Sequence, residues 1–490
     1  MDRCRHVTIE AILARPDLAG SQFGTAFYDL QSDRFVFEHA SDVLFAGAST
    51  TKTLTCAAAL HALGEDYRFI TRVVRTGPVD AQGVLHGDLV IVAVGDPNLS
   101  GRINERDELE FCDYDHALAG AGYDVGVVER DPLLVIRALA GQIAGAGIRE
   151  VQGRVAVDLA AFADAGPEPG TGVLISSVAV NDNLVDLTFT AGTHAGDRVV
   201  LSAAPETSYV RFVNRLVTVS PDETHHVRLV GHADDRGCQV VEIIGTIPAG
   251  DTRRGAYAVP SPAAFAASAF ARALEERGIR VAGGPAFAPI GPYDDADTVA
   301  VHRSPPLREA VKVILKVSQN LHAEMLPRAV ERARGAAPAD AGTTFTAARE
   351  LIESLGLLDH GVYQGDGCGA AGTFSARFMC RFLAAIRRQP WAPAFERALP
   401  VLGRDGTLHG VQTASRAAAA SAIRAKTGTM GYADRIFARS LVTAKALAGY
   451  MTTAKGSHLA FAIFAQNVPG TVDEVGELVG EIAVRAYEAL

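Results

Sequence analysis

The sequence is poor in lysine, in basic clusters and in long hydrophobic runs. Six of its 46 basic residues are lysine, so most cationic positions carry arginine, which cannot lose its proton in a protein. No basic run suggests a nucleic-acid-binding face, and the net charge is −10. No uncharged apolar stretch reaches about 18 residues, which argues against a transmembrane segment.

Metal-ligand and disulfide patterns are also absent. The six cysteines never form Cys-x-x-Cys, and there is no His-Glu-x-x-His, so we expect no metal site, and nothing calls for a cofactor. The first residues, Met1-Asp-Arg-Cys-Arg-His, have no apolar core behind them and do not read as a signal peptide. With 48% hydrophobic and 21% charged residues, the composition is that of a folded globular protein.

The most informative stretch is Ser49-Thr-Thr-Lys52, which lies between Gly47 and an alanine- and leucine-rich run from Leu54 to Leu63. This order predicts a loop that turns into a helix, with Ser49 in its first turn. Residues three apart share a helix face, so the Lys52 amine can reach the Ser49 hydroxyl, which needs a base to attack a carbonyl. A lysine serves as that base where nearby positive charge and burial lower its pKa. A solvated helix lysine is the alternative.

A second motif, Ser318-Gln-Asn320, falls between two predicted helices, Arg308–Val317 and Leu321–Arg334. Residues two apart do not share a helix face, so both side chains make better sense in the turn between the helices. There a hydroxyl can relay a proton, and an amide can donate to and accept from a peptide backbone.

A third motif, Lys426-Thr427-Gly428-Thr429, precedes the last predicted strands. Lys426 would supply positive charge, which binds an anionic substrate end and helps to keep a neighbouring lysine neutral. Gly428 would let a substrate approach the backbone, and a kink beside it would bring Lys426 and Thr427 near one ligand.

The two ends of the chain are predicted to pair in one sheet, followed by an amphipathic C-terminal helix over Val472–Leu490. The long middle would then be an insertion, in which residues 173–246 are rich in predicted strands and Val84–Val94 reads as one strand. The strands expected at the two ends are Phe23–Leu30, Arg34–His39, Ala446–Thr452 and Leu459–Asn467.

Ser-x-x-Lys, Ser-Asp-Asn and Lys-Thr-Gly form the motif set of penicillin-binding proteins and class A β-lactamases, and the three motifs here follow in that order, with Ser-Gln-Asn in the second place. The sequence resembles the class C low-molecular-mass penicillin-binding proteins, the D-alanyl-D-alanine carboxypeptidase/endopeptidase family (peptidase family S13). Ser49 and Ser318 are 269 positions apart, and members of this family carry inserted domains there, whereas β-lactamases lack them. Gly95-Asp-Pro-Asn and Asp405-Gly-Thr-Leu are also similar to family segments.

The resemblance implies an α/β (α+β) architecture. Its main domain would be a transpeptidase domain of the penicillin-binding/serine β-lactamase-like type, an antiparallel sheet flanked by helices, with two inserted, strand-rich domains. The expected boundaries are residues 1–66 and 300–490 for this discontinuous domain, 67–95 and 247–299 for the first insert, and 96–246 for the second insert, nested in the first.

The resemblance also implies a serine DD-peptidase, a D-alanyl-D-alanine carboxypeptidase or DD-endopeptidase that acts on peptidoglycan stem peptides through an acyl-enzyme on Ser49. β-Lactam antibiotics should acylate Ser49 and leave slowly, and the expected place of action is the cell envelope, periplasmic or extracellular. The implied catalytic residues are Ser49, Lys52, Ser318, Asn320 and Lys426, and the implied substrate-binding residues are Thr427, Gly428 and Thr429.

Two segments depart from the family pattern. Cys368 replaces a serine in Asp366-Gly-Cys-Gly, and the stretch from Met430 to Ala446 is longer and more charged than expected, which bears on the rim of the site. Two other functions stay open. A β-lactamase or related esterase with the same motifs would turn over nitrocefin rapidly. A non-catalytic cell-wall-binding protein on the same fold would bind peptidoglycan without cleaving a D-Ala-D-Ala peptide.

Overall fold

The computed structural model describes residues 8–122, 124–159, 161–284, 286–287, 291–358, 360–410 and 419–490. The chain divides into two compact units. Unit 1 comprises Met1–Asp66, Leu307–Val330 and Phe345–Leu490, and unit 2 comprises Tyr67–Pro306 and Glu331–Thr344. The N-terminal stretch that bears on the signal-peptide expectation lies outside the described residues.

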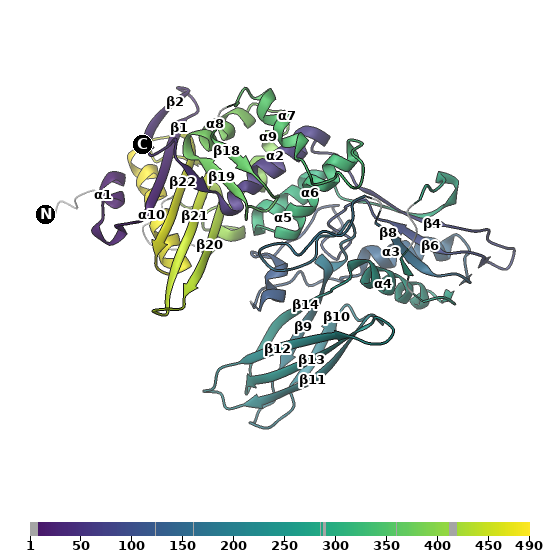
Figure 1. Cartoon of the computed structure of the whole chain (residues 1–490). Coiled ribbons are helices and arrows are strands. Elements are labelled where there is room, and N and C mark those ends of the chain that lie inside the picture. The colour runs from purple at the N-terminus through teal and green to yellow at the C-terminus, as the bar shows by residue number, and fades with distance from the viewer. Residues whose placement is uncertain are drawn as a thin grey trace. The chain divides into compact units, whose positions relative to one another are not determined.

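Unit 1 is built on a five-stranded antiparallel sheet in the order β2-β1-β22-β21-β20 (Figure 1). This sheet joins strands from both ends of the chain, so the predicted pairing of the termini is confirmed. A smaller sheet has the order β18-β19-β3. The strands are β1 (Gln22–Asp29), β2 (Arg34–His39), β3 (Leu44–Ala46), β18 (Val362–Gln364), β19 (Gly372–Ser375), β20 (Ile423–Asp434), β21 (Arg439–Thr452) and β22 (His458–Pro469).

Helices pack on both faces of the five-stranded sheet, because side chains alternate between the faces along each strand. Ile463 of β22 belongs to the same buried cluster as Val475 of α10. On the opposite face, the Tyr450 hydroxyl of β21 donates to the carbonyl of Leu383 in α8 (2.8 Å). The helices of unit 1 are α1 (Ile9–Leu13), α2 (Lys52–Leu63), α5 (Leu307–Val317), α7 (Thr346–Ser354), α8 (Ala376–Ile386), α9 (Ala392–Ala398) and α10 (Val472–Ala489), together with the start of α6 (Asn320–Ala333).

Helix α2 is the core helix of unit 1. Every residue from Lys52 to Leu60 is buried, which explains why this run is rich in alanine on all sides instead of amphipathic. The helix follows a 3₁₀ turn, η2 (Ala48–Thr51), and Ala48 takes the left-handed conformation with φ of +43°. The predicted change from loop to helix is confirmed, and its first turn is tighter than an α-helical turn.

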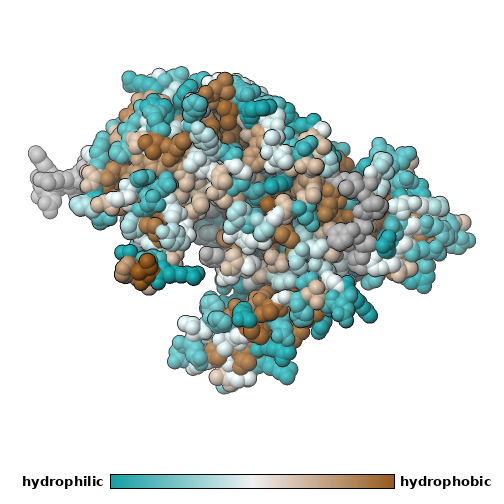
Figure 2. Space-filling model, viewed as in Figure 1, coloured by the Kyte–Doolittle hydropathy of each residue, from teal (hydrophilic) through white to brown (hydrophobic). Residues whose placement is uncertain are grey.

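Strands β20 and β21 form a long hairpin at the edge of the sheet, in which β21 stays paired with β22 as far as Leu441. At its end Ile436 is 82% exposed and Phe437 is 67% exposed, while Arg439 pairs with Asp434 (3.0 Å). Figure 2 shows this apolar end with hydrophilic residues beside it. The hairpin is therefore the structural form of the long, charged stretch between Met430 and Ala446.

Unit 2 contains four sheets, with strand orders β16-β8-β6-β4-β17, β15-β7-β5, β10-β9-β14 and β11-β13-β12 among the described residues. The strand-rich character expected of residues 173–246 is confirmed. The elements are β4 (Ile70–Arg75), β5 (Val84–Leu85), β6 (Leu89–Val92), α3 (Leu134–Gly145), β7 (Glu150–Val151), β8 (Val155–Asp158), β9 (Leu184–Thr190), β10 (Val200–Ala204), β11 (Val210–Val219), β12 (His226–Ala233), β13 (Gln239–Pro248), β14 (Thr252–Ala258), α4 (Pro262–Glu276), β15 (Arg280–Val281), β16 (Ala286–Phe287) and β17 (Thr298–Arg303).

The prediction of one strand over Val84–Val94 is wrong. The segment breaks into β5 and β6 at Gly87, where a side chain would lie 2.7 Å from the backbone nitrogen of Gly77. Glycine therefore allows this turn to close onto the neighbouring chain. The proposed division of the insert into residues 67–95 with 247–299, and 96–246, stays a prediction.

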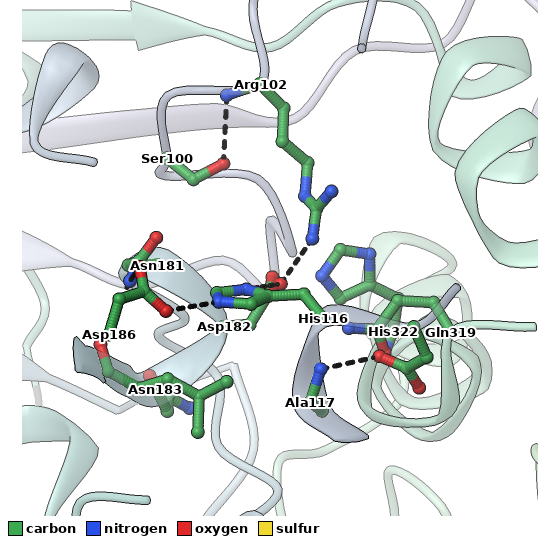
Figure 3. Close-up of polar contacts among 12 residues, drawn as sticks. Ser100, Arg102, His116, Ala117, Asn181, Asp182, Asn183, Asp186, Gln319 and His322 are labelled. Carbon is green, nitrogen blue, oxygen red and sulfur yellow. Dashed lines mark hydrogen bonds and ion pairs between the residues drawn. The ribbon is translucent and has the colours of Figure 1, made fainter. Parts of the chain in front are cut away.

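A buried network of charged side chains lies within unit 2 (Figure 3). The imidazole of His116 contacts Asp182 through Nδ1 (2.8 Å) and Asp186 through Nε2 (2.5 Å), and Arg102 also pairs with Asp182. Burial opposes the protonated imidazole, but the two carboxylates outweigh it and raise the pKa of His116 to about 10.

We expect this network to make the stability of unit 2 depend on pH. An unperturbed histidine has a pKa of 6.5, so the stabilisation is fully present below that pH and is lost as the pH rises through 10. Thermal unfolding of the wild type and of His116→Gln should be followed from about pH 6 to about pH 10, which spans the two pKa values. The difference in stability between the two proteins should be smaller at high pH. A difference that is constant or grows with pH would contradict a protonated His116.

Candidate active site

The Ser49 hydroxyl and the Lys52 amine meet at the junction of η2 and α2. Residues three apart are nearly eclipsed in a 3₁₀ turn, and Lys52 Nζ donates to Ser49 Oγ at 2.8 Å. The Lys52 side chain is fully buried. A buried amine needs hydrogen-bond partners, so its other contacts define the site.

Lys52 Nζ reaches two further acceptors from elements distant in the sequence. It donates to Asn320 Oδ1 at 2.6 Å and to the backbone carbonyl of Cys368 at 3.0 Å. Ser318 Oγ lies 3.5 Å away. The first two motifs, far apart along the chain, thus lie within hydrogen-bond distance of one another.

Ser318 stands between α5 and α6 in the left-handed conformation, with φ of +65°. An ordinary side chain rarely adopts this conformation, and such strain is found where a residue must be aimed at a site. Its Oγ accepts from Lys426 Nζ at 2.9 Å, and Lys426 also donates to the carbonyl of Thr427 (2.8 Å). Ser318 therefore lies between two buried lysine amines.

Strand β20 carries the third motif against η2, the turn that contains Ser49. A Cβ on Gly428 would lie 2.6 Å from the carbonyl oxygen of Gly47, so only glycine permits this approach. The Thr427 hydroxyl exchanges a hydrogen bond with Thr407 (2.9 Å), and Thr429 Oγ1 accepts from Lys445 (3.0 Å). A bulge displaces the ladder just beyond, at Met430.

Sequence reasoning missed Thr407 as a neighbour of the site. Its loop is anchored by the buried Lys316, whose Nζ donates to Asp405 Oδ1 at 2.6 Å and to the carbonyl of Leu399 at 2.7 Å. Burial lowers the pKa of Lys316, although Asp405 opposes that shift. The scarcity of lysine was a usable signal, because Lys316 and Lys445 both hold neighbours of the site.

Glu324, Asp366 and Cys368 place three potential metal-ligand atoms within 4.8 Å of one another. The carboxylates are already engaged, since Glu324 accepts from the N–H groups of Gly367 and Cys368, and Asp366 from those of Gly369 and Ala371. Burial raises the pKa of the Cys368 thiol to about 12, so the thiolate that a soft metal needs is disfavoured. These side chains therefore fit a role in shaping the loop better than metal binding.

The fold and the assembled motifs define a serine acyl-transfer enzyme of the penicillin-binding protein and serine β-lactamase class. Residues 6–481 match the D-Ala-D-Ala carboxypeptidase 3 (S13) family, and the chain belongs to that family. It is a serine peptidase with DD-peptidase activity, as the resemblance implied.

Similar proteins agree with this assignment. A D-alanyl-D-alanine carboxypeptidase of Actinomadura sp. (strain R39) is 28% identical over 480 residues, which cover 93% of this chain and 79% of the relative. The D-alanyl-D-alanine carboxypeptidase DacB of Haemophilus influenzae is 22% identical over 461 residues, covering 91% of this chain and 85% of the relative. The crystal structure of penicillin binding protein 4 (dacB) from H. influenzae superposes with a TM-score of 0.74 at 20% identity, covering 96% of this chain and 97% of that one. A structure of that protein complexed with a β-lactam gives a TM-score of 0.71 at 20% identity, with the same coverage.

Among the helices that the structure of the present chain describes, none combines the length and the apolar character needed to cross a membrane.

Proposed function

We propose that Ser49 is the nucleophile of this DD-peptidase and that it cleaves the bond between two terminal D-alanines of peptidoglycan stem peptides. The observation that carries the proposal is the 2.8 Å hydrogen bond between Lys52 Nζ and Ser49 Oγ in a buried site. A serine hydroxyl is a weak nucleophile, and a lysine amine beside it is a base of the right chemistry.

In its neutral form Lys52 keeps two N–H groups, which can donate to Asn320 and Cys368, and a lone pair that can accept from Ser49. In the first step this neutral amine takes the Ser49 proton as Oγ bonds to the carbonyl carbon of the penultimate D-alanine. The oxygen of that carbonyl becomes negatively charged, and the backbone N–H groups of Ser49 and Thr429 would stabilise it. Such a donor contributes roughly 3 kcal/mol in other acyl-transfer enzymes. The C–N bond then breaks, which leaves the acyl group as an ester on Ser49.

The leaving amine needs a proton, and we assign its delivery to Ser318. Its hydroxyl accepts from Lys426 at 2.9 Å and lies 3.5 Å from Lys52 Nζ, so a proton can pass through it from either amine. Asn320 holds Lys52 through its amide oxygen and would orient the substrate amide. Water then hydrolyses the ester and restores the Ser49 hydroxyl.

The terminal carboxylate of the substrate would be bound beside β20. Lys426 supplies the positive charge, and the Thr427 hydroxyl, already paired with Thr407, supplies a donor. Gly428 keeps the strand close to the nucleophile turn. β-Lactams present a similar carboxylate and carbonyl, so the same contacts would let them acylate Ser49.

The substrate also indicates where the enzyme works. Membership of a family of D-Ala-D-Ala carboxypeptidases supports action on the cell wall, hence in the periplasm or outside the cell. Removal of terminal D-alanine and cleavage of cross-links are both compatible with the chemistry of the site, because each breaks a bond on the carboxyl side of a D-alanine.

Incubation with a pentapeptide ending in D-Ala-D-Ala tests the proposal. We expect free D-alanine to be released, and the same peptide ending in L-Ala-L-Ala to stay intact. Digestion of purified muropeptides, with the products separated by mass, would show whether cross-links are cut as well.

Benzylpenicillin separates the proposal from the β-lactamase alternative. A DD-peptidase should gain the mass of the intact antibiotic and keep it after free antibiotic is removed. Rapid turnover of nitrocefin, with no persistent adduct and no release of D-alanine, would instead favour a β-lactamase.

A further inference from the structure

The turn from Gly365 to Gly372 brings a backbone carbonyl to the catalytic lysine. The carbonyl of Cys368 accepts from Lys52 Nζ at 3.0 Å. This turn lies directly against α6, since a Cβ on Gly367 would fall 2.0 Å from the carbonyl oxygen of Ala323. Its position therefore decides one of the hydrogen bonds that orient Lys52.

Glu324 of α6 holds this turn. Its Oε1 accepts from the backbone N–H groups of Gly367 and Cys368, both at 2.8 Å. Its Oε2 pairs with Arg328 at 3.1 Å, one helical turn further on. The Glu324 side chain is only 3% exposed, so its contacts are shielded from water. Hydrogen bonds to a carboxylate are stronger in such a buried place than in water.

The same helix also contacts Lys52 directly. Asn320 lies four residues before Glu324, on the same face of α6, and accepts from Lys52 at 2.6 Å. Asn320 thus acts on the amine itself, while Glu324 fixes the Cys368 residue whose carbonyl faces that amine. One helix face determines two of the acceptors of Lys52.

We propose that Glu324 is a positioning residue for Lys52, acting through the Gly365–Gly372 turn. The inference rests on the proposed function, in which Lys52 is the base that activates Ser49. Without the carboxylate, two buried N–H groups lose their acceptor, and the turn moves away from Lys52 to find other partners. The amine then loses one of the contacts that aim it at Ser49.

The test compares Glu324→Ala and Glu324→Gln with the wild type for the rate of Ser49 acylation by benzylpenicillin. Misplacing a catalytic group by about 1 Å costs on the order of 100-fold in rate, which is the loss expected for Glu324→Ala. Glu324→Gln keeps an oxygen that accepts the two N–H groups, so its rate should stay within about 10-fold of the wild type. Both variants lose the ion pair with Arg328, so both should melt at a lower temperature.

Two further measurements distinguish a positioning role of Glu324 from an effect on stability alone. The loss should appear in the limiting acylation rate at saturating benzylpenicillin and not in the concentration needed for half-saturation. Asp131→Ala is the matched control, because Asp131 also accepts a backbone N–H, that of Leu133, and pairs with an arginine, Arg137, but in unit 2. That variant should lose stability without losing acylation rate.

Gly367→Ala provides a second route if Glu324→Ala does not fold. The added methyl group meets the Ala323 carbonyl and displaces the same turn without changing any charge. It should slow acylation as Glu324→Ala does. Equal rates for Glu324→Ala and the wild type, equally slow Ala and Gln variants, or a wild-type rate for Gly367→Ala would each overturn the positioning role. Failure of the wild type itself to form an adduct would instead reject the proposed function.

Discussion

Ser49→Ala is expected to abolish both release of D-alanine and formation of a penicillin adduct. The variant has no oxygen with which to form the acyl bond, and loss of the nucleophile in a serine peptidase costs about 10⁶-fold in rate. Intact-protein mass measured after long incubation with benzylpenicillin gives the result directly. We expect one antibiotic per wild-type chain and none on Ser49→Ala.

Ser318→Ala is the matched control for that experiment. It removes the Ser318 hydroxyl, whose Oγ lies 2.9 Å from Lys426 Nζ in the same pocket. Ser49 and its contact with Lys52 stay in place. Slow labelling of Ser318→Ala together with none of Ser49→Ala would assign the acyl bond to Ser49. Two results would show that another residue is the nucleophile. One is a full adduct on Ser49→Ala, and the other is loss of labelling in Ser318→Ala but not in Ser49→Ala.

Much of the catalytic arrangement could be predicted from the sequence, because the chemistry constrains residue type. The hydroxyl and amine groups that the structure brings together belong to serine and lysine side chains of the three motifs, and each motif is a short unbroken segment. The pairing of the chain ends was also predictable, since β1 and β22 are short, mainly apolar segments, as buried strands are. Here local pattern and tertiary structure agree.

Other parts of the site leave no such trace. Cys368 contacts Lys52 through its backbone carbonyl, and every residue has one, so no residue type marks this contact. Thr407 and Glu324 act through neighbours that are distant in the sequence. The break at Gly87 likewise depends on Gly77, which approaches it only in the folded chain. Such features depend on contacts between residues that are distant in the sequence, and a local sequence pattern cannot predict those contacts.

Lys52→Arg and Lys52→Met should both slow acylation of Ser49 by about 10²- to 10⁴-fold, the contribution of a well-placed general base. Arginine keeps the positive charge but does not release its proton, and methionine keeps most of the length without charge or proton. If Lys52 acted only as a fixed charge, arginine would preserve activity. The two variants together therefore test whether the amine accepts a proton.

The measurement is the rate of adduct formation with benzylpenicillin, followed until the end point. Because Ser49 remains, both variants should label slowly, which separates loss of the base from loss of the nucleophile. Lys312→Arg is a suitable control, since Lys312 lies on α5 in an ion pair with Glu309, where arginine can replace it. If Lys52→Arg is acylated as fast as the wild type, Lys52 is not the base, because a guanidinium cannot take the Ser49 proton. Lys426, whose Nζ lies 2.9 Å from Ser318 Oγ, would then be the next candidate for the base.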